Sequence, residues 1–346
     1  MFSALSAESL SQNSFSVMKA MILAAGFGTR LFPLTIDRTK PAIPFLGKPL
    51  VGYVAEYVAK FGFTDVVVNL HHQPESVEKA LGDGGNYGVK IHYTLEEPKI
   101  LGTAGALDNA RHYLENETFL IVNGKIITDI DISAALETHR NSGALATMVL
   151  KPNPKRERFT IVETEGNLIT GFGDFPTFDS RLSTLDSPLM FTGIHILEPR
   201  VFNYIPRGVY SDIVPTFYRP AIARGEKIVA HITDANWFEL STIPRYLDIS
   251  LAMLNGQKEK VVKGENVKIS ASATVKDSVI WDDVSIADGA QISKTIIADD
   301  VKIGKDERFE NVAIVRAEML NHCDEIPEKA LRGYMHGENY VVPLNQ

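Results

Sequence analysis

Isoleucine and valine recur about every six residues beyond residue 260, with turn-forming pairs such as Asp288-Gly289 between them. A six-residue period fits neither a helix nor a strand, and it is typical of the hexapeptide repeat of a parallel β-helix. The sequence therefore predicts a short left-handed parallel β-helix over residues 260–310, followed by a cap or tail over 311–346. A small antiparallel sheet with accidental spacing is the alternative. The periodic positions are Ile269, Val275, Ile280, Ile286, Ile292, Ile297 and Ile303.

A different pattern covers residues 18–255, where short apolar runs alternate with segments of helical spacing. We expect strands at 19–25, 65–70, 89–93, 118–123, 144–151 and 189–197, and helices at 49–61, 74–81, 102–114, 132–142 and 243–255. A hairpin is expected around Glu165-Gly166, and a flexible loop at 176–187. Such alternation predicts an α/β domain with a mixed, mostly parallel, Rossmann-like sheet that helices cover on both faces. Ligands of such sheets bind beyond the carboxyl ends of the strands.

Composition narrows the functional classes. The 346 residues are long enough for two domains, and the net charge of −8 argues against a dedicated nucleic-acid binder. The single cysteine, Cys323, excludes a disulfide framework and fits a reducing compartment such as the cytoplasm. No apolar run reaches the length of a membrane span, so no membrane partner is expected. Residues 1–17 are rich in serine and are expected to form a disordered leader rather than a secretory signal.

The strongest chemical signal is the stretch LAAGFGTRL at residues 23–31. A strand enters a loop with Gly26 and Gly28, whose backbone amides are free to approach a phosphate, and Arg30 can hold phosphate oxygens in a bidentate manner. The stretch is neither a Walker loop nor the Rossmann fingerprint, because no Gly-Lys-Ser/Thr follows and Leu31 fills the third glycine position. Taken alone, two glycines after a strand also fit a plain tight turn.

The next segments make the pattern specific. PLT at 33–35, KPAIP at 40–44 and GKPL at 47–50 follow the glycine loop, and LGTAGAL at 101–107, Asn123-Gly124 and FTGI at 191–194 come later. In this order the motifs resemble those of the NDP-sugar pyrophosphorylases, the sugar-1-phosphate nucleotidyltransferases. The resemblance spans about residues 18–305 and is greatest to the mannose-1-phosphate guanylyltransferase branch. It implies a nucleotidyltransferase domain over 18–255 whose substrates are a nucleoside triphosphate and a sugar 1-phosphate, in a homo-oligomer formed through the C-terminal region.

The resemblance also implies roles for individual residues. Arg30 and Lys40 would act in catalysis on the phosphates. We also expect Lys125, which departs from the family pattern, to act with them. Glu163, Thr192 and Gly193 would face the sugar, although Glu163 also fits an ordinary surface position, and Lys40 a solvated one. The residues that would bind the nucleotide are Leu23, Ala24, Ala25, Gly26, Gly28, Thr29, Gly102, Thr103, Ala104, Asn123 and Gly124.

Three positions depart from the family pattern, and all three concern the chemistry. The family's Asn-Gly-Asp reads Asn123-Gly124-Lys125, its second metal-binding aspartate is Glu239, and the lysine that contacts the sugar phosphate is Phe175. A lysine facing Glu239 would pair with it and oppose Mg²⁺, so Mg²⁺ and a metal role for Glu239 are both in doubt. Asp129 and Asp131 lie nearby as substitute ligands, but Asp131 also fits a helix N-cap.

Two functions from different classes follow. The first is a nucleotidyltransferase that forms an NDP-sugar, of the GDP-mannose type, with an altered metal site in which the Lys125 ammonium stands in for the metal. The second is a catalytically silent homologue that binds a nucleotide or NDP-sugar and regulates a partner. Both predict an intact nucleotide loop.

Overall fold

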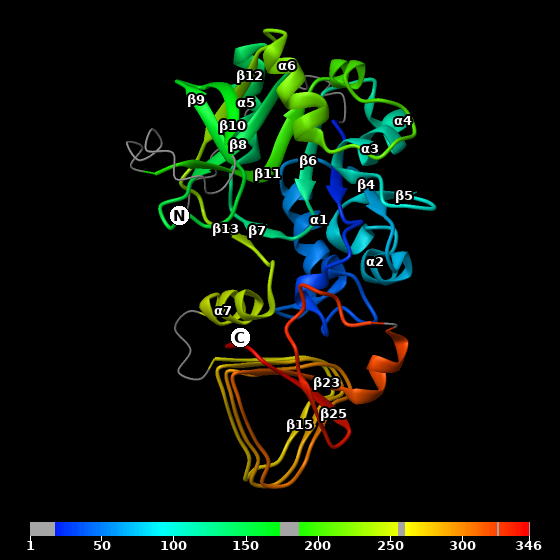
Figure 1. The fold of residues 1–346 in the computed structure, drawn as a ribbon, viewed down its shortest axis with the longest axis vertical. Helices are drawn as coiled ribbons and strands as arrows, with labels where there is room; N and C mark the ends of the chain where they lie inside the picture. The colour runs from blue at the N-terminus through cyan, green and yellow to red at the C-terminus, as the bar shows by residue number, and fades with distance from the viewer. Residues whose placement is uncertain (1–17, 174–186, 255–259, 324, 346) are drawn as a thin grey trace, which may run out of the picture.

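The computed structural model describes residues 18–173, 187–254, 260–323 and 325–345. Its upper part in Figure 1 is a mixed sheet in the order β5-β4-β1-β6-β11-β8-β12-β10-β9. Parallel pairing joins β5, β4, β1 and β6, and also β8 to β12. The strands are β1 (Ala20–Leu23), β4 (Asp65–Leu70), β5 (Lys90–Leu95), β6 (Phe119–Asn123), β8 (Ala146–Pro152), β9 (Ile161–Glu165), β10 (Leu168–Gly173), β11 (Leu189–Leu197) and β12 (Ile228–Ile232).

The predicted mixed α/β sheet is confirmed, but "mostly parallel" describes only part of it. Strand β11 runs antiparallel to β6 and to β8, and the hairpin β9–β10 adds further antiparallel pairs. The helices are α1 (Leu50–Lys60), α2 (Pro74–Leu81), α3 (Gly102–Asn109), α4 (Arg111–Leu114), α5 (Ile132–Ser142), α6 (Arg219–Ala223) and α7 (Ile243–Ala252). The single helix expected at 102–114 is therefore two, because the chain leaves helical geometry at Ala110.

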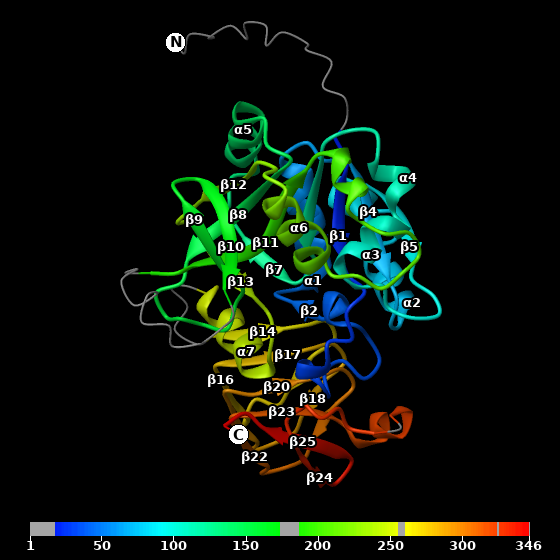
Figure 2. The ribbon, with the colours of Figure 1, turned by 45° about the horizontal axis from the view of Figure 1, so that its top comes forward.

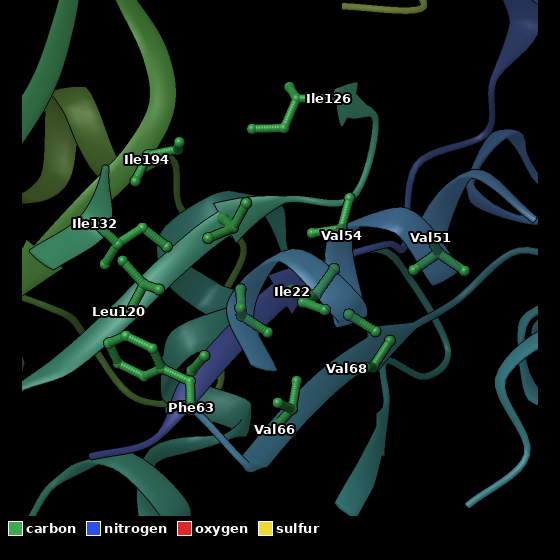
Figure 3. Packing of buried hydrophobic residues seen from close by; sticks show 14 of the residues in the cluster. Ile22, Val51, Val54, Phe63, Val66, Val68, Leu120, Ile126, Ile132 and Ile194 are labelled. Atoms are coloured by element: carbon green, nitrogen blue, oxygen red, sulfur yellow. The ribbon is translucent and has the colours of Figure 1, made fainter. Parts of the chain in front are cut away.

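Alternate residues of the central strands face opposite layers. In β1, Ala20 and Ile22 belong to one apolar cluster, whereas Met21 belongs to the other. The first cluster is covered by α1, α2 and α5, and the second by α3, α4 and α6. Figure 3 shows Ile22 close to Val54 of α1 and Val68 of β4. Burial on both faces explains why these strands read as continuous apolar runs. The predicted loop at 176–187 lies almost wholly outside the described residues.

The lower part is a stack of short parallel strands, which Figure 1 shows end-on as a triangle. Val262 pairs with Val279, and Ile269 pairs with Ile286, so equivalent positions recur every 17 residues. One sheet contains β14 (Val261–Lys263), β17 (Ser278–Ile280), β20 (Ile296–Ile297) and β23 (Val312–Arg316). The second contains β15 (Lys268–Ile269), β18 (Ser285–Ile286) and β21 (Lys302–Ile303). The third contains β16 (Thr274–Lys276), β19 (Gln291–Ser293) and β22 (Arg308–Glu310).

The pairing within this stack is parallel, so the antiparallel alternative for 260–310 is excluded. The register does not fix the handedness, and the left-handed β-helix stays a prediction. The stack runs past the expected end at 310, because β23 continues the first sheet to Arg316. The antiparallel strands β25 (Asn339–Pro343) and β24 (Tyr334–His336) then complete that sheet.

Two small sheets and α7 connect the parts. Strand β2 (Pro44–Phe45) pairs with β3 (Lys48–Pro49), and β7 (Ile126–Thr128) pairs with β13 (Trp237–Glu239). Figure 2 shows α7 between the large sheet and the stack. No helix among the described residues is both long and apolar enough to cross a membrane.

Candidate functional site

The glycine loop follows β1 and returns through a short 3-10 helix at Thr29–Leu31. Gly28 has a φ of 68°, and a Cβ there would lie 3.2 Å from both Lys40 Cβ and Thr35 Cγ2. Glycine therefore allows this loop to close against the segment that carries Lys40. Gly26, by contrast, has no such neighbour within 4 Å and is exposed.

A second pair of segments brings Lys125 and Glu239 together. Lys125 directly precedes β7, Glu239 ends β13, and the antiparallel register places Glu239 opposite Ile126. The Lys125 ammonium forms an ion pair and a hydrogen bond with the Glu239 carboxylate. This pairing was expected from the replacement of an acidic residue by Lys125. Glu239 is buried, and Lys125 is one-third exposed.

Lys40 completes a charged cluster with Arg30, Lys125 and Glu239. Its side chain is only 8% exposed, so it is not the solvated surface lysine that was the alternative. Burial, together with the charges of Lys125 and Arg30, lowers the pKa of Lys40 to about 7, although Glu239 acts in the opposite direction. Burial acts to raise the pKa of Glu239, but the nearby cations, Lys125 first, bring it below its usual value. The Glu239 carboxylate thus lies within the electrostatic reach of Lys125, Lys40 and Arg30.

The residues present do not fit a protein-held Mg²⁺ ion. The Glu239 carboxylate is paired with an ammonium group. Asp129 uses both oxygens to accept hydrogen bonds from Asn236, at 2.7 Å each. Asp131 caps α5 by accepting from the backbone amides of Ser133 and Ala134. Within the described ranges, no group of three or more acidic, histidine or cysteine side chains is arranged to hold a metal.

A cavity of about 240 Å³ lies where β1 and β6 end, at the point where the chain order of the sheet changes direction. Leu23, Thr103 and Asn123, which come from three separate motifs, line it together. Other lining residues were not predicted as site residues: Phe191, His195, Asp212, Ile213, Val214 and Ile121. Phe191 belongs to the FTGI motif, whereas no sequence signal marked Asp212.

The small residues at the start of α3 serve close packing of the chain itself. A Cβ on Gly102 would lie 2.7 Å from the Ser211 carbonyl oxygen. The Thr103 hydroxyl accepts a hydrogen bond from the Ile213 amide at 2.8 Å. Ala104 is fully buried in the apolar core. Gly102 and Ala104 therefore pack against the chain itself, whereas Thr103 lines the cavity, and the nucleotide-binding roles of all three stay predictions.

The ends of β1 and β6 and the middle of β11 approach closely through glycines. A Cβ on Gly193, whose φ is 82°, would lie 2.1 Å from Asn123 Nδ2, and one on Gly124 would lie 2.8 Å from the Leu23 carbonyl oxygen. Thr192 is fully buried and donates its hydroxyl to the Val149 carbonyl oxygen at 2.7 Å. The Thr192 hydroxyl is therefore used inside the core, and the contact between Thr192-Gly193 and a sugar stays a prediction.

The remaining predicted site residues do not gather around one cavity. Glu163 is exposed on β9 beside Gly171, and it does not line the cavity at Asn123. Ala24 and Ala25 are buried behind the glycine loop, Thr29 is half-buried, and Arg30 is exposed. Phe175 lies outside the described residues.

Comparison with known proteins places this geometry among nucleotidyl transferases. The Nucleotidyl transferase family model matches residues 19–256, and the GMPPB C-terminal domain model matches residues 257–331. A UTP–glucose-1-phosphate uridylyltransferase of Synechocystis is 32% identical over 77% of this chain and 71% of its own length. A mannose-1-phosphate guanyltransferase of Aspergillus oryzae is 30% identical over 75% of this chain and 73% of its own length.

A crystal structure from Bacillus anthracis, assigned provisionally as a glucose-1-phosphate thymidylyltransferase in complex with a sucrose, has the same fold with a TM-score of 0.59. It is 23% identical and covers 69% of this chain and 96% of its own.

Proposed function

The chain belongs to the nucleotidyl transferase family, and we propose that it transfers a nucleotidyl group from a nucleoside triphosphate to a sugar 1-phosphate. A phosphate oxygen of the sugar 1-phosphate attacks the α-phosphorus, the bond between the α-phosphorus and its bridging oxygen breaks, and pyrophosphate leaves. The protein has to align two polyanions and stabilise the charge that develops on pyrophosphate.

The charged cluster carries this proposal. Lys125 is paired with the Glu239 carboxylate, and Lys40 and Arg30 lie close enough to act on the same carboxylate electrostatically. A net positive site at the end of a glycine loop suits a triphosphate. In the proposed complex, the backbone at Gly26, Gly28 and Thr29 holds the phosphates, with the base and ribose in the cavity lined by Leu23, Thr103 and Asn123.

Lys125 then supplies the charge that a metal site would otherwise provide. An aspartate carboxylate together with one Mg²⁺ ion carries one net positive charge, and so does a lysine ammonium. The substitution therefore preserves the local charge although it removes a metal ligand. Binding of a triphosphate would draw the ammonium from Glu239 towards the α-phosphate, because the polyanion is the stronger partner.

The match of the C-terminal region suggests which nucleotide base and which sugar the substrates carry. Relatives that are about equally similar to this chain act, by name, on uridine and guanosine nucleotides, so overall identity does not select a base. We propose the GDP-mannose type because the C-terminal match is to a GMPPB domain. Glu163 and the Gly193 backbone are the proposed contacts to the sugar.

We propose two domains, one over 18–255 and one that begins at 260 and runs past 310 to include β23. The second is proposed to be a left-handed parallel β-helix that mediates homo-oligomerisation. The change of matching family model near residue 257 supports the boundary. The 17-residue recurrence of parallel pairs supports the β-helix. Sedimentation velocity on the full chain tests the oligomer.

One observation favours a second function, a silent nucleotide-binding homologue that regulates a partner. The Lys125–Glu239 ion pair occupies both positions at which the family resemblance implies metal-binding carboxylates. If the pair stays closed when nucleotide binds, the Lys125 ammonium is not available for the α-phosphate and turnover is lost.

Pyrophosphate release decides between the two functions. The purified chain is incubated with ATP, GTP, UTP or dTTP and a panel of sugar 1-phosphates, and nucleotide binding is measured in parallel by calorimetry. The enzyme proposal predicts pyrophosphate release with at least one pair, most with GTP and mannose 1-phosphate. Binding without release supports the silent homologue, and the absence of nucleotide binding contradicts both.

A further inference from the structure

A chain of buried hydrogen bonds connects two loops at the ends of β1 and β5. The Ala24 amide donates to Asn69 Oδ1 at 2.8 Å, and Asn69 Nδ2 donates to Glu96 Oε1 at 2.6 Å. The Leu101 amide donates to the other carboxylate oxygen, Glu96 Oε2, at 2.6 Å. Asn69 and Glu96 are 3% and 1% exposed, so water does not replace these bonds.

The sheet fixes both side chains in place. Asn69 lies on β4 in register with Leu23 of β1 on one side and Thr94 of β5 on the other. Glu96 follows β5, and its amide donates to the Leu70 carbonyl oxygen at 2.8 Å. The two side chains therefore join the ends of three adjacent strands.

We propose that Asn69 and Glu96 are positioning residues that hold the glycine loop and the loop before α3 at the separation that nucleotide binding requires. This inference rests on the proposed function. Ala24 begins the glycine loop, and Leu101 precedes Gly102 and Thr103. The Leu101 carbonyl oxygen also accepts a hydrogen bond from the Ser211 amide at 2.9 Å, which extends the connection to the cavity wall at Asp212.

The order of donors and acceptors in this series of hydrogen bonds requires one carboxylate and one amide side chain. Both ends are backbone N–H donors, so the two side chains must together offer three acceptors and one donor along the path. If both side chains were amides, two N–H donors would face each other in every orientation of the two amide groups. A buried donor left without an acceptor is costly. Two carboxylates place acceptor against acceptor.

This requirement gives a rescue test. Glu96→Gln and Asn69→Asp each break the alternation. The double variant N69D/E96Q restores it in reverse, because the aspartate accepts from the Ala24 amide and from the glutamine amide, whose oxygen accepts from the Leu101 amide. The total charge is also that of the wild type. Glu115→Gln is the matched control, because Glu115 is exposed and takes no part in this series of hydrogen bonds.

Calorimetry with GTP and with UTP measures binding, and calorimetry with mannose 1-phosphate measures the other substrate. Each single variant is expected to weaken nucleotide binding about tenfold, the double variant to recover most of the loss, and Glu115→Gln to bind like the wild type. Mannose 1-phosphate affinity is expected to stay unchanged, whereas a general loosening of the fold would weaken both ligands. Single variants that bind nucleotide like the wild type, or a folded double variant without recovery, would overturn the inference.

Amide hydrogen exchange separates this inference from the proposed function. Exchange at Ala24 and Leu101 in the free protein should be faster in both single variants and slow again in the double variant, whether or not the chain binds a nucleotide. Unchanged exchange at both amides in the single variants would refute the connection itself. A wild type that binds none of ATP, GTP, UTP and dTTP would instead refute the proposed function.

Discussion

Lys40 is a lysine in a position where a positive charge is costly. It is buried, and Arg30 and Lys125 add repulsion, so its pKa falls to about 7. At pH 8 most Lys40 side chains in the free protein are therefore neutral. A bound triphosphate brings negative charge to the ammonium and raises the pKa towards that of an ordinary lysine.

Nucleotide binding should consequently take up a proton at pH 8. Because the free protein holds fewer protons than the complex above about pH 7, affinity should fall as the pH rises, by at most about tenfold per pH unit. Calorimetry at pH 8 in two buffers of different ionisation enthalpy measures this uptake, and Lys40→Met should abolish it. Binding enthalpies that are identical in the two buffers would show that Lys40 does not change its protonation.

At the level of single elements, the glycine loop depends on the backbone conformation of Gly28. An alanine there would have a positive φ and a Cβ 3.2 Å from both Lys40 and Thr35. We expect Gly28→Ala to lower the free energy of unfolding by about 1–2 kcal/mol. Gly26→Ala, which meets no neighbour within 4 Å, should change it by less than about 0.5 kcal/mol. Urea unfolding of both variants measures the difference; equal effects would contradict this role of Gly28.

Elements with strong local signals were predictable from the sequence. Strand β4, with the continuous apolar run of a buried strand, lies at the predicted residues, and α5 begins at its Asp131 cap and ends before Gly143 as predicted. The break at Ala110 carries no proline or glycine signal, so it was not predicted. The segment around Asp212 lacks periodicity, and it reaches the cavity only because Gly102 and Gly105 let it approach α3.

In the candidate site, too, some features were predictable from local sequence motifs and others were not. The glycine motif pointed to Arg30, the KPAIP motif pointed to Lys40, and the departure from the family pattern predicted the Lys125–Glu239 pair. Burial of Lys40, the hydroxyl bond of Thr192 and the link between Asn69 and Glu96 depend on neighbours distant in sequence. No local pattern encodes such contacts.

On the scale of the whole molecule, Tyr246 of α7 joins the sheet domain to the stack. Its hydroxyl donates to the Pro44 carbonyl oxygen at 2.6 Å and accepts from Trp281 Nε1 at 3.0 Å. Arg38 adds a bond to Asp299 at 2.6 Å. These contacts hold the stack beneath the loop that leads to Lys40.

Tyr246→Phe should therefore destabilise the molecule as a unit. The variant leaves the buried Trp281 N–H without its acceptor, which costs about 1–3 kcal/mol. Tyr93→Phe removes an exposed bond to the Gly82 carbonyl oxygen, and water should compensate for most of that loss. Urea unfolding followed by tryptophan fluorescence measures both variants; equal stability of Tyr246→Phe and the wild type would contradict a connection through Tyr246.

In the proposed reaction, the Lys125 ammonium provides the charge that a metal site would otherwise provide. The most direct measurement is pyrophosphate release by the wild type and by Lys125→Ala in excess chelator, with the best nucleotide and sugar 1-phosphate pair. We predict that the wild type keeps its rate when divalent ions are removed and that Lys125→Ala loses roughly a thousandfold. Wild-type release that stops on chelation, or that Lys125→Ala leaves unchanged, would contradict the account.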